Sequence, residues 1–268
     1  MSVRTIKRGN SRFYIDPTDP NTKVPGVTSI LNMLPKDFLG PWNGKMSAEF
    51  TADNIGPIVG LLVSGQRQAA IDMIKGAARR FTKDAADLGS DAHDLFERLA
   101  RGESIPENRV HADLRPFRTH FLEFLDVAQP EFLHIEETVW SDTYGYAGSF
   151  DSIARIDGET VIVDFKTTRS GVHAQTALQN IAYARADRII IAATGESIPL
   201  PEIDASAVLH VRPEGWKMHP LSFEDADFDY FLGLRETFDW DSDRSKRVIG
   251  NPVFAGGFTE TGTQRRGR

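Results

Sequence analysis

The sequence predicts an α+β fold with a helical N-terminal elaboration, on the strength of three observations. Apolar residues recur at helical spacing from residue 27 to residue 102 and again from 108 to 128. Three segments rich in β-branched and aromatic residues then follow, separated by turn residues. Another helical segment, two more strands and a last helix complete the pattern. Helices first and then a run of strands is the order typical of an α+β core.

The helical part begins after a short hairpin or loop within the first 25 residues. One helix opens at Thr28, and others are expected at 45–54 and 82–101, the last of them stopped by Gly102. The segment 108–128 is amphipathic, because its apolar side chains recur every three or four residues. This apolar stripe consists of Phe117, Phe121, Phe124 and Leu125.

The second half of the chain alternates between strands and helices. The expected strands are 132–140, 146–156, 160–167, 207–211 and 216–221, and the expected helices are 172–193 and 224–238. No internal repeat or linker interrupts this pattern. We therefore expect one domain over residues 1–255, with an N-terminal elaboration at 1–80 and a core at 81–240. A flexible basic tail is expected at 256–268.

The composition narrows the classes of function. The 268-residue chain has no cysteine, which excludes disulfides, thiolate zinc sites, cysteine nucleophiles and iron–sulfur clusters. We find no signal peptide, no membrane-spanning stretch and no P-loop, and expect a cytoplasmic protein without a membrane partner. The net charge of −7 counts against a protein that coats nucleic acid. It is compatible with an enzyme that has a local basic groove and an acidic, metal-binding centre.

The segment after residue 145 contains the clearest chemical signal. Asp157-Gly158 is a strong two-residue hairpin turn, because a type I′ turn needs positive φ at both positions. With this turn as the loop, Asp151 lies directly opposite Asp164. Lys166 shares the face of Asp164, because side chains alternate along a strand. One face of the hairpin is therefore predicted to present two carboxylates and an ammonium group.

Two facing carboxylates repel each other and need a compensating cation. A hard divalent ion that prefers oxygen ligands, such as Mg²⁺, meets this need. The alternative is a solvent-exposed hairpin face on which the acids align by chance, and a register slip of one residue would separate them. Against this alternative, Asp164 ends the apolar run 161–163, where a charge without a role is costly.

Four motifs, in order along the chain, resemble the RecB-like exonuclease branch of the PD-(D/E)XK nucleases. They are Gly-x-x-x-His at 89–93, Gly-x-x-Asp at 148–151, Asp-x-Lys at 164–166 and Gln-x-x-x-Tyr at 179–183. The beginning of the chain is also similar to phage-encoded members of that branch. The resemblance implies a restriction-endonuclease-like α/β core, in which helices flank a mixed central sheet. The iron–sulfur cluster of some relatives is excluded by the lack of cysteine.

The resemblance assigns a metal site to the hairpin. The implied ligands of Mg²⁺ or Mn²⁺ are His93, Asp151, Asp164 and the backbone carbonyl of Phe165. Lys166 would orient the attacking water and offset charge on the phosphate, so the implied catalytic residues are Asp151, Asp164 and Lys166. Similar proteins place a further acid on the strand before the hairpin, and here Glu136 and Glu137 are equally plausible.

Contacts with DNA are implied on both sides of this site. Gln179 and Tyr183 are four residues apart on one helix face, where they would brace the site and contact DNA. Thr167, Thr168 and Arg169 directly follow the catalytic lysine, within reach of phosphates. Further candidates are the cations that precede the helix of His93, although a solvated helix face explains such a run equally well. These cations are Lys75, Arg79, Arg80 and Lys83.

Together these expectations describe a metal-dependent DNA exonuclease that acts in phage DNA replication, recombination or end processing. Its partners would be DNA and phage recombination or replication proteins in the host cytoplasm. Four alternatives stay open. They are a catalytically silent nucleic-acid-binding module, an endonuclease of the same fold, an enzyme that acts on RNA or branched DNA, and an unrelated fold with an incidental hairpin.

Overall fold

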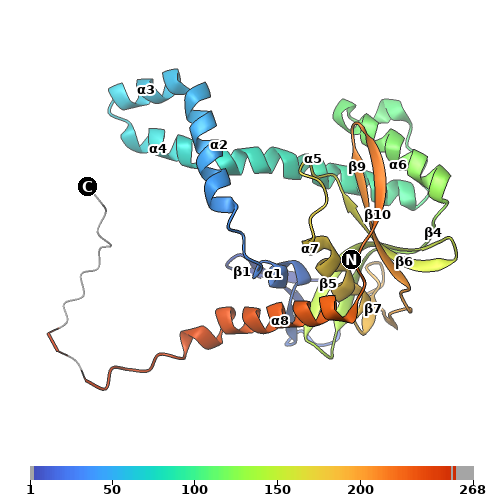
Figure 1. The fold of residues 1–268 in the computed structure, drawn as a ribbon. Coiled ribbons are helices and arrows are strands. Elements are labelled where there is room, and N and C mark those ends of the chain that lie inside the picture. The colour runs from blue at the N-terminus through green and yellow to red at the C-terminus, as the bar shows by residue number, and fades with distance from the viewer. Residues whose placement is uncertain (1–2, 255, 258–268) are drawn as a thin grey trace.

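The computed structural model describes residues 3–254 and 256–257, without the side chains at 84 and 85. It has an α+β fold built on a seven-stranded mixed sheet (Figure 1). The strand order is β10-β9-β6-β5-β4-β7-β8, in which β6 and β9 run parallel and the other neighbours run antiparallel. The strands are β4 (Glu131–Ser141), β5 (Tyr146–Ile156), β6 (Glu159–Lys166), β7 (Arg188–Ile190), β8 (Ser197–Pro199), β9 (Ala205–Arg212) and β10 (Gly215–Pro220).

Helices cover both faces of this sheet. One face is covered by α1 (Val27–Leu31), α7 (Gln175–Ala184) and α8 (Asp225–Ser242), and the other by α5 (Ala77–Ala100) and α6 (Arg115–Ala128). Strand β6 faces both layers, because Ile162 packs into the first core while Val161 and Val163 pack into the second. The predicted Phe stripe of α6 is buried in the second core. The central sheet between two helical layers confirms the predicted α+β class.

Three helices extend the N-terminal part away from the sheet. They are α2 (Leu39–Asp53), α3 (Ile55–Val63) and α4 (Arg67–Lys75), which project at one end of the long helix α5 (Figure 1). Short 3₁₀ turns lie at Glu107–Arg109, Ala112–Leu114 and Arg244–Lys246. Within the described part of the chain, every helix is too short or too polar to cross a lipid bilayer. The predicted helical elaboration is thus present, whereas α3 and α4 were not anticipated as separate helices.

The first residues form a small sheet of their own. Its strands, in order, are β1 (Thr5–Arg8), β2 (Ser11–Ile15) and β3 (Lys23–Pro25), so the predicted N-terminal hairpin is confirmed and extended by a third strand. A bridge between Gly26 and Ala147 attaches this sheet to β5. The predicted basic tail lies, from residue 258 onward, outside the described residues.

The helix predicted at 172–193 is wrong in its second half. Helix α7 ends at Ala184, and the chain then forms β7 and β8 at the edge of the main sheet. Ile189 and Ile190 are buried there, because β7 pairs with β4. Helical spacing of apolar residues continues through this segment. The pairing with a strand some fifty positions earlier overrides that local signal.

The register predicted for the β5–β6 hairpin is confirmed. Ile156 pairs with Glu159 across the turn, and the ladder continues without a shift to Ser152 and Val163. Asp157 and Gly158 have φ values of 50° and 88°, the double positive φ that a type I′ turn requires. The turn therefore determines which residues of the two strands face each other.

Candidate active site

Asp151 and Asp164 occupy equivalent places on neighbouring strands, just beyond the last ladder pair of β5 and β6. That last pair is Ser152 and Val163, so the two aspartates are the next positions along each strand. A carboxylate oxygen of Asp151, Oδ2, accepts a hydrogen bond of 2.5 Å from the backbone N–H of Phe165. This bond ties the two strands together where the ladder stops. A metal contact through the carbonyl of Phe165 stays a prediction.

Lys166 and Gln179 hold the carboxylate of Asp164. The ammonium Nζ lies 2.7 Å from Oδ1 and 2.6 Å from Oδ2, and Gln179 Nε2 donates to Oδ1 at 3.0 Å. Only the contact to Oδ1 has hydrogen-bond geometry, so Oδ2 is a buried oxygen without a hydrogen-bond partner. The prediction that Lys166 shares the face of Asp164 is confirmed. The metal-binding role predicted for Asp164 stays a prediction.

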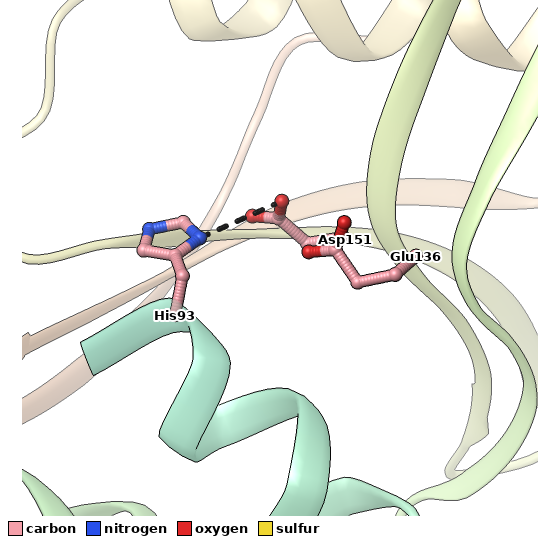
Figure 2. A group of neighbouring side chains, drawn as sticks. All are labelled: His93, Glu136 and Asp151. Atoms are coloured by element: carbon pink, nitrogen blue, oxygen red, sulfur yellow. Dashed lines mark ion pairs between the residues drawn. The ribbon is translucent and has the colours of Figure 1, made fainter. Parts of the chain in front are cut away.

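A second group of side chains meets on the other side of Asp151 (Figure 2). His93 from α5, Glu136 from β4 and Asp151 from β5 each offer one ligand atom, and these three atoms lie within 4.8 Å of one another. The Nδ1 atom of His93 lies 3.7 Å from Oδ1 of Asp151. Imidazole and carboxylate groups at this separation are able to share one cation. Of the predicted ligands, the structure therefore brings His93 and Asp151 together, and it adds Glu136.

Backbone geometry decides which of the two adjacent glutamates reaches the site. Glu136 has a φ of 53°, unusual for a residue with a long side chain. Its neighbours on β4, Ile135 and Glu137, both pair with residues of β5. Glu136 itself lies opposite Asp151 but does not form a ladder pair with it. Glu137 is buried, and its carboxylate accepts a short hydrogen bond from the backbone N–H of Ala192. Glu136 is therefore the acid at the site, and Glu137 anchors the segment after β7.

Burial and crowding shift the ionisation of these groups. Burial, followed by the charges of Asp151 and Glu97, raises the pKa of Glu136 to about 7. Burial and the charge of Asp151 likewise raise the pKa of Asp164 to about 6, although Lys166 opposes the shift. Burial acts in the same direction on Asp151, but the adjacent His93 and Lys166 outweigh it and lower its pKa. The site thus holds three carboxyl groups close together, and burial removes them from most of their contact with water.

The same contact shifts the imidazole. Burial lowers the pKa of His93, but the Asp151 carboxylate outweighs burial and raises it. Ring contacts with Phe96 and Phe165 fix the imidazole on α5, at centroid separations of 6.3 and 6.5 Å. A packed histidine that keeps one nitrogen toward two carboxylates is well placed to bind a cation.

The three groups open into a pocket of about 540 Å³. Its wall on α5 includes Gly89, Asp94 and Glu97, and its wall on β5 includes Ser149. A Cβ atom at Gly89 would come within 3.3 Å of Thr167 Oγ1, so a larger residue there would press on the end of β6. Sequence reasoning overlooked Glu97, although it lies four residues after His93 and hence on the same helix face.

Helix α7 supports the site from behind. Tyr183 is only 2% exposed, and a Cβ atom at Gly148 would collide with its ring, which explains the glycine of the Gly-x-x-Asp motif. Burial raises the pKa of Tyr183 well above its ordinary value. Two roles are predicted for Gln179 and Tyr183: bracing the site and contacting DNA. In the structure, both side chains brace the site. The burial of Tyr183 is inconsistent with direct contact between its ring and DNA.

The loop after Lys166 is held by its own hydrogen bonds. The carbonyls of Thr167 and Thr168 accept bonds from Arg212 (2.9 Å) and His210 (2.8 Å). The Thr168 hydroxyl donates to the carbonyl of Gly171 at 2.6 Å. This hydroxyl is thus engaged within the loop, and a contact between it and phosphate stays a prediction. Arg169 is exposed and stays a candidate phosphate contact.

The projecting helices α2, α3 and α4 form a helical arm at one end of α5. The cations before His93 lie in this arm and in the part of α5 next to it. Arg80 lies over the ring of Phe50 at 4.6 Å and donates to the carbonyl of Met73 at 2.6 Å, so its guanidinium ties α5 to α2 and α4. Lys83 forms an ion pair with Asp87 at 2.7 Å. Of the two arginines predicted to bind DNA, Arg80 has a structural role, whereas Arg79 is exposed.

Comparison with known proteins does not identify a family for this chain. No protein-family model matches the sequence, and no curated protein matches it. The family resemblance therefore depends on the four motifs and on how the structure arranges them.

Proposed function

We propose that the protein is a metal-dependent nuclease that hydrolyses phosphodiester bonds of DNA, most simply as an exonuclease in phage DNA replication, recombination or end processing. The observation that supports this most strongly is the convergence of four separate motifs. His93 on α5 lies beside Asp151 on β5, and Lys166 on β6 and Gln179 on α7 both contact Asp164 on the neighbouring strand. A hairpin with acids aligned by chance would not also bring a histidine and a glutamine to those acids.

The residues present fit a divalent cation. Asp151 and Glu136 offer carboxylate oxygens, and His93 offers a ring nitrogen. Oδ2 of Asp164, which has no hydrogen-bond partner but lies 2.6 Å from the Lys166 ammonium, is a further oxygen close by. Carboxylates suit Mg²⁺ and Mn²⁺, and the imidazole favours the softer Mn²⁺. A cation bound there would supply Lewis acidity, which lowers the pKa of a coordinated water and offsets charge on phosphate oxygens.

The chain's own groups would do the rest of the chemistry. The Lys166 ammonium, positioned by Asp164, would donate to a non-bridging phosphate oxygen or to the attacking water. The Glu136 carboxylate, which lines the pocket beside Asp151, would be placed to accept a proton from that water. Gln179 and Tyr183 would keep Asp164 in place from behind.

The experiment is cleavage of matched linear and covalently closed circular DNA, with Mg²⁺, with Mn²⁺ and with chelator. Metal-dependent loss of linear DNA alone is the expected result, and Lys166→Met should reduce it by about a hundredfold or more. The matched control is Lys217→Met, which removes an exposed lysine on β10 and should leave the rate unchanged. Cleavage of the circle would instead establish an endonuclease. No cleavage of any substrate by wild type, with DNA still bound, would refute the catalytic proposal.

A further inference from the structure

The N-terminal sheet presents a cluster of unneutralised positive charge on a protein whose net charge is −7. The cations are Arg4, Lys7, Arg8 and Arg12. Side chains alternate along a strand, so Lys7 and Arg12 share one face of the hairpin, which we call the N-terminal basic patch, and Arg8 lies on the opposite face with Phe13. All four side chains are exposed, and within the described residues none of them forms an ion pair with an acid. Their one recorded side-chain contact is the guanidinium of Arg8 over the ring of Phe13, at 5.6 Å. The arginines on the strands of the main sheet, by contrast, form ion pairs with carboxylates.

Two of these cations face each other directly. Lys7 of β1 pairs with Arg12 of β2, so their side chains leave the same face of the hairpin side by side. Like charges in this position oppose pairing of the strands. The register cannot slip to relieve them, because Tyr14 and Ile15 of β2 are buried against the body of the protein. An arrangement that is unfavourable in the free protein becomes favourable when an anion lies over it.

The patch is connected to the rim of the pocket by hydrogen bonds. Tyr14, two residues from Arg12 on the same face of β2, accepts a bond of 3.2 Å from the backbone N–H of Ser149 through its hydroxyl. That hydroxyl also lies 3.3 Å from the Ser149 hydroxyl. Ser149 lines the pocket, two residues before Asp151. Two residues along a strand span about 7 Å, so Arg12 lies about that far along β2 from Tyr14, whose side chain reaches the pocket wall.

The backbone beneath the patch is held firmly. The N–H of Arg12 donates to the Ser29 hydroxyl of α1 at 2.8 Å, and that hydroxyl donates back to the Arg12 carbonyl at 3.3 Å. Gly26 bridges to Ala147 on β5. The charges are thus presented from a fixed position relative to the catalytic hairpin and do not belong to a free terminus.

We infer that the N-terminal basic patch binds the phosphodiester backbone of the nucleic-acid strand that enters the pocket. This inference rests on the proposed function and names the part of the surface that holds its substrate. Phosphates repeat along a strand at a few ångströms, and exposed cations neutralise them regardless of base sequence. Of the other candidate cations, Arg80 and Lys83 have contacts within the protein, whereas Arg79 and Arg169 are exposed. The N-terminal basic patch is favoured among the exposed cations because the hydrogen bonds of Tyr14 connect its strand to Ser149 in the pocket wall.

The test is binding of a fluorescently labelled DNA oligonucleotide in chelator, measured by anisotropy at several salt concentrations. The double variant Lys7→Gln with Arg12→Gln should raise Kd by roughly tenfold at 0.1 M salt. It should also reduce the slope of log K against log salt by about 1.4 to 1.8, since each phosphate contact contributes about 0.7 to 0.9. A second variant, Arg4→Gln with Arg8→Gln, removes the same charge from outside the patch and should weaken binding less. The control is Lys217→Gln with Lys246→Gln, the same loss of charge on β10 and beyond α8.

The double variant is expected to fold, because it removes a like-charge pair, and its melting temperature should equal or exceed that of wild type. Unchanged Kd and salt slope in the variant of Lys7 and Arg12 would overturn the inference, and so would an equal loss of affinity in the control or in the variant of Arg4 and Arg8. Because the assay contains no metal, it is independent of turnover. Weakened binding together with an inactive wild type would refute the nuclease and leave the patch as a nucleic-acid-binding surface.

Discussion

Asp164→Asn should stabilise the folded protein at neutral and higher pH, in the absence of metal. The pKa of Asp164 is raised from 3.8 to about 6, first by burial and then by the charge of Asp151. The folded protein therefore binds this proton more tightly than the unfolded chain, so the free energy of unfolding falls as pH rises from about 4 to about 6. A shift of this size corresponds to about 3 kcal/mol above pH 6.

Asparagine keeps the shape of the side chain and an oxygen for Lys166 and Gln179, but has no charge to bury. Lys166 loses its counter-ion, which reduces the gain, so we expect a net stabilisation of about 1 to 3 kcal/mol at pH 8. The gain should vanish below about pH 4, where wild-type Asp164 is protonated in both states.

Urea denaturation in chelator at pH 8 and pH 4 measures this difference. Asp229→Asn is the matched control, since it removes an exposed carboxylate of α8 and should change stability little at either pH. If Asp164→Asn were less stable than wild type at pH 8, the ion pair with Lys166 would outweigh burial and the repulsion from Asp151. The reasoning that this carboxylate is held at a cost in stability would then be refuted.

Three further predictions address the supports and ligands of the site. Gly148→Ala should lower the melting temperature and cleavage together, because its methyl group collides with the ring of Tyr183; Gly256→Ala serves as control. Asp16→Asn should cost about 1 to 3 kcal/mol at pH 7, by urea denaturation, because it removes the carboxylate that lies 2.7 Å from Arg188. Burial raises the pKa of Asp16, but its hydrogen bonds and Arg188 lower it overall, so this loss should fade below about pH 4. Glu136→Gln should weaken Mn²⁺ binding in calorimetry by about tenfold or more, and equal affinity would exclude it as a ligand.

Much of the β5–β6 hairpin follows from local chemistry. Asp157-Gly158 specifies a type I′ turn, and a two-residue turn sets the register of both strands. Once the register is set, the alternation of side chains places Asp164 and Lys166 on one face. The helix and strand types of the long periodic segments follow in the same way, because each depends on neighbours within a few residues.

Other features depend on contacts between distant segments, and local patterns do not contain them. Glu136 reaches the site only because β4 departs from regular pairing at a positive φ, where neither glutamate of the pair has a distinguishing sequence signal. Strand β7 exists because the edge of β4 is there to pair with it. The N-terminal cations acquire a location beside the pocket through Tyr14 and Ser149, which are 135 residues apart. The sequence by itself determined the turn, the register and the residue types of the hairpin, because these depend on near neighbours. Only the tertiary structure decided which of the two glutamates and which cations lie beside it, because packing brings those residues together from distant parts of the chain.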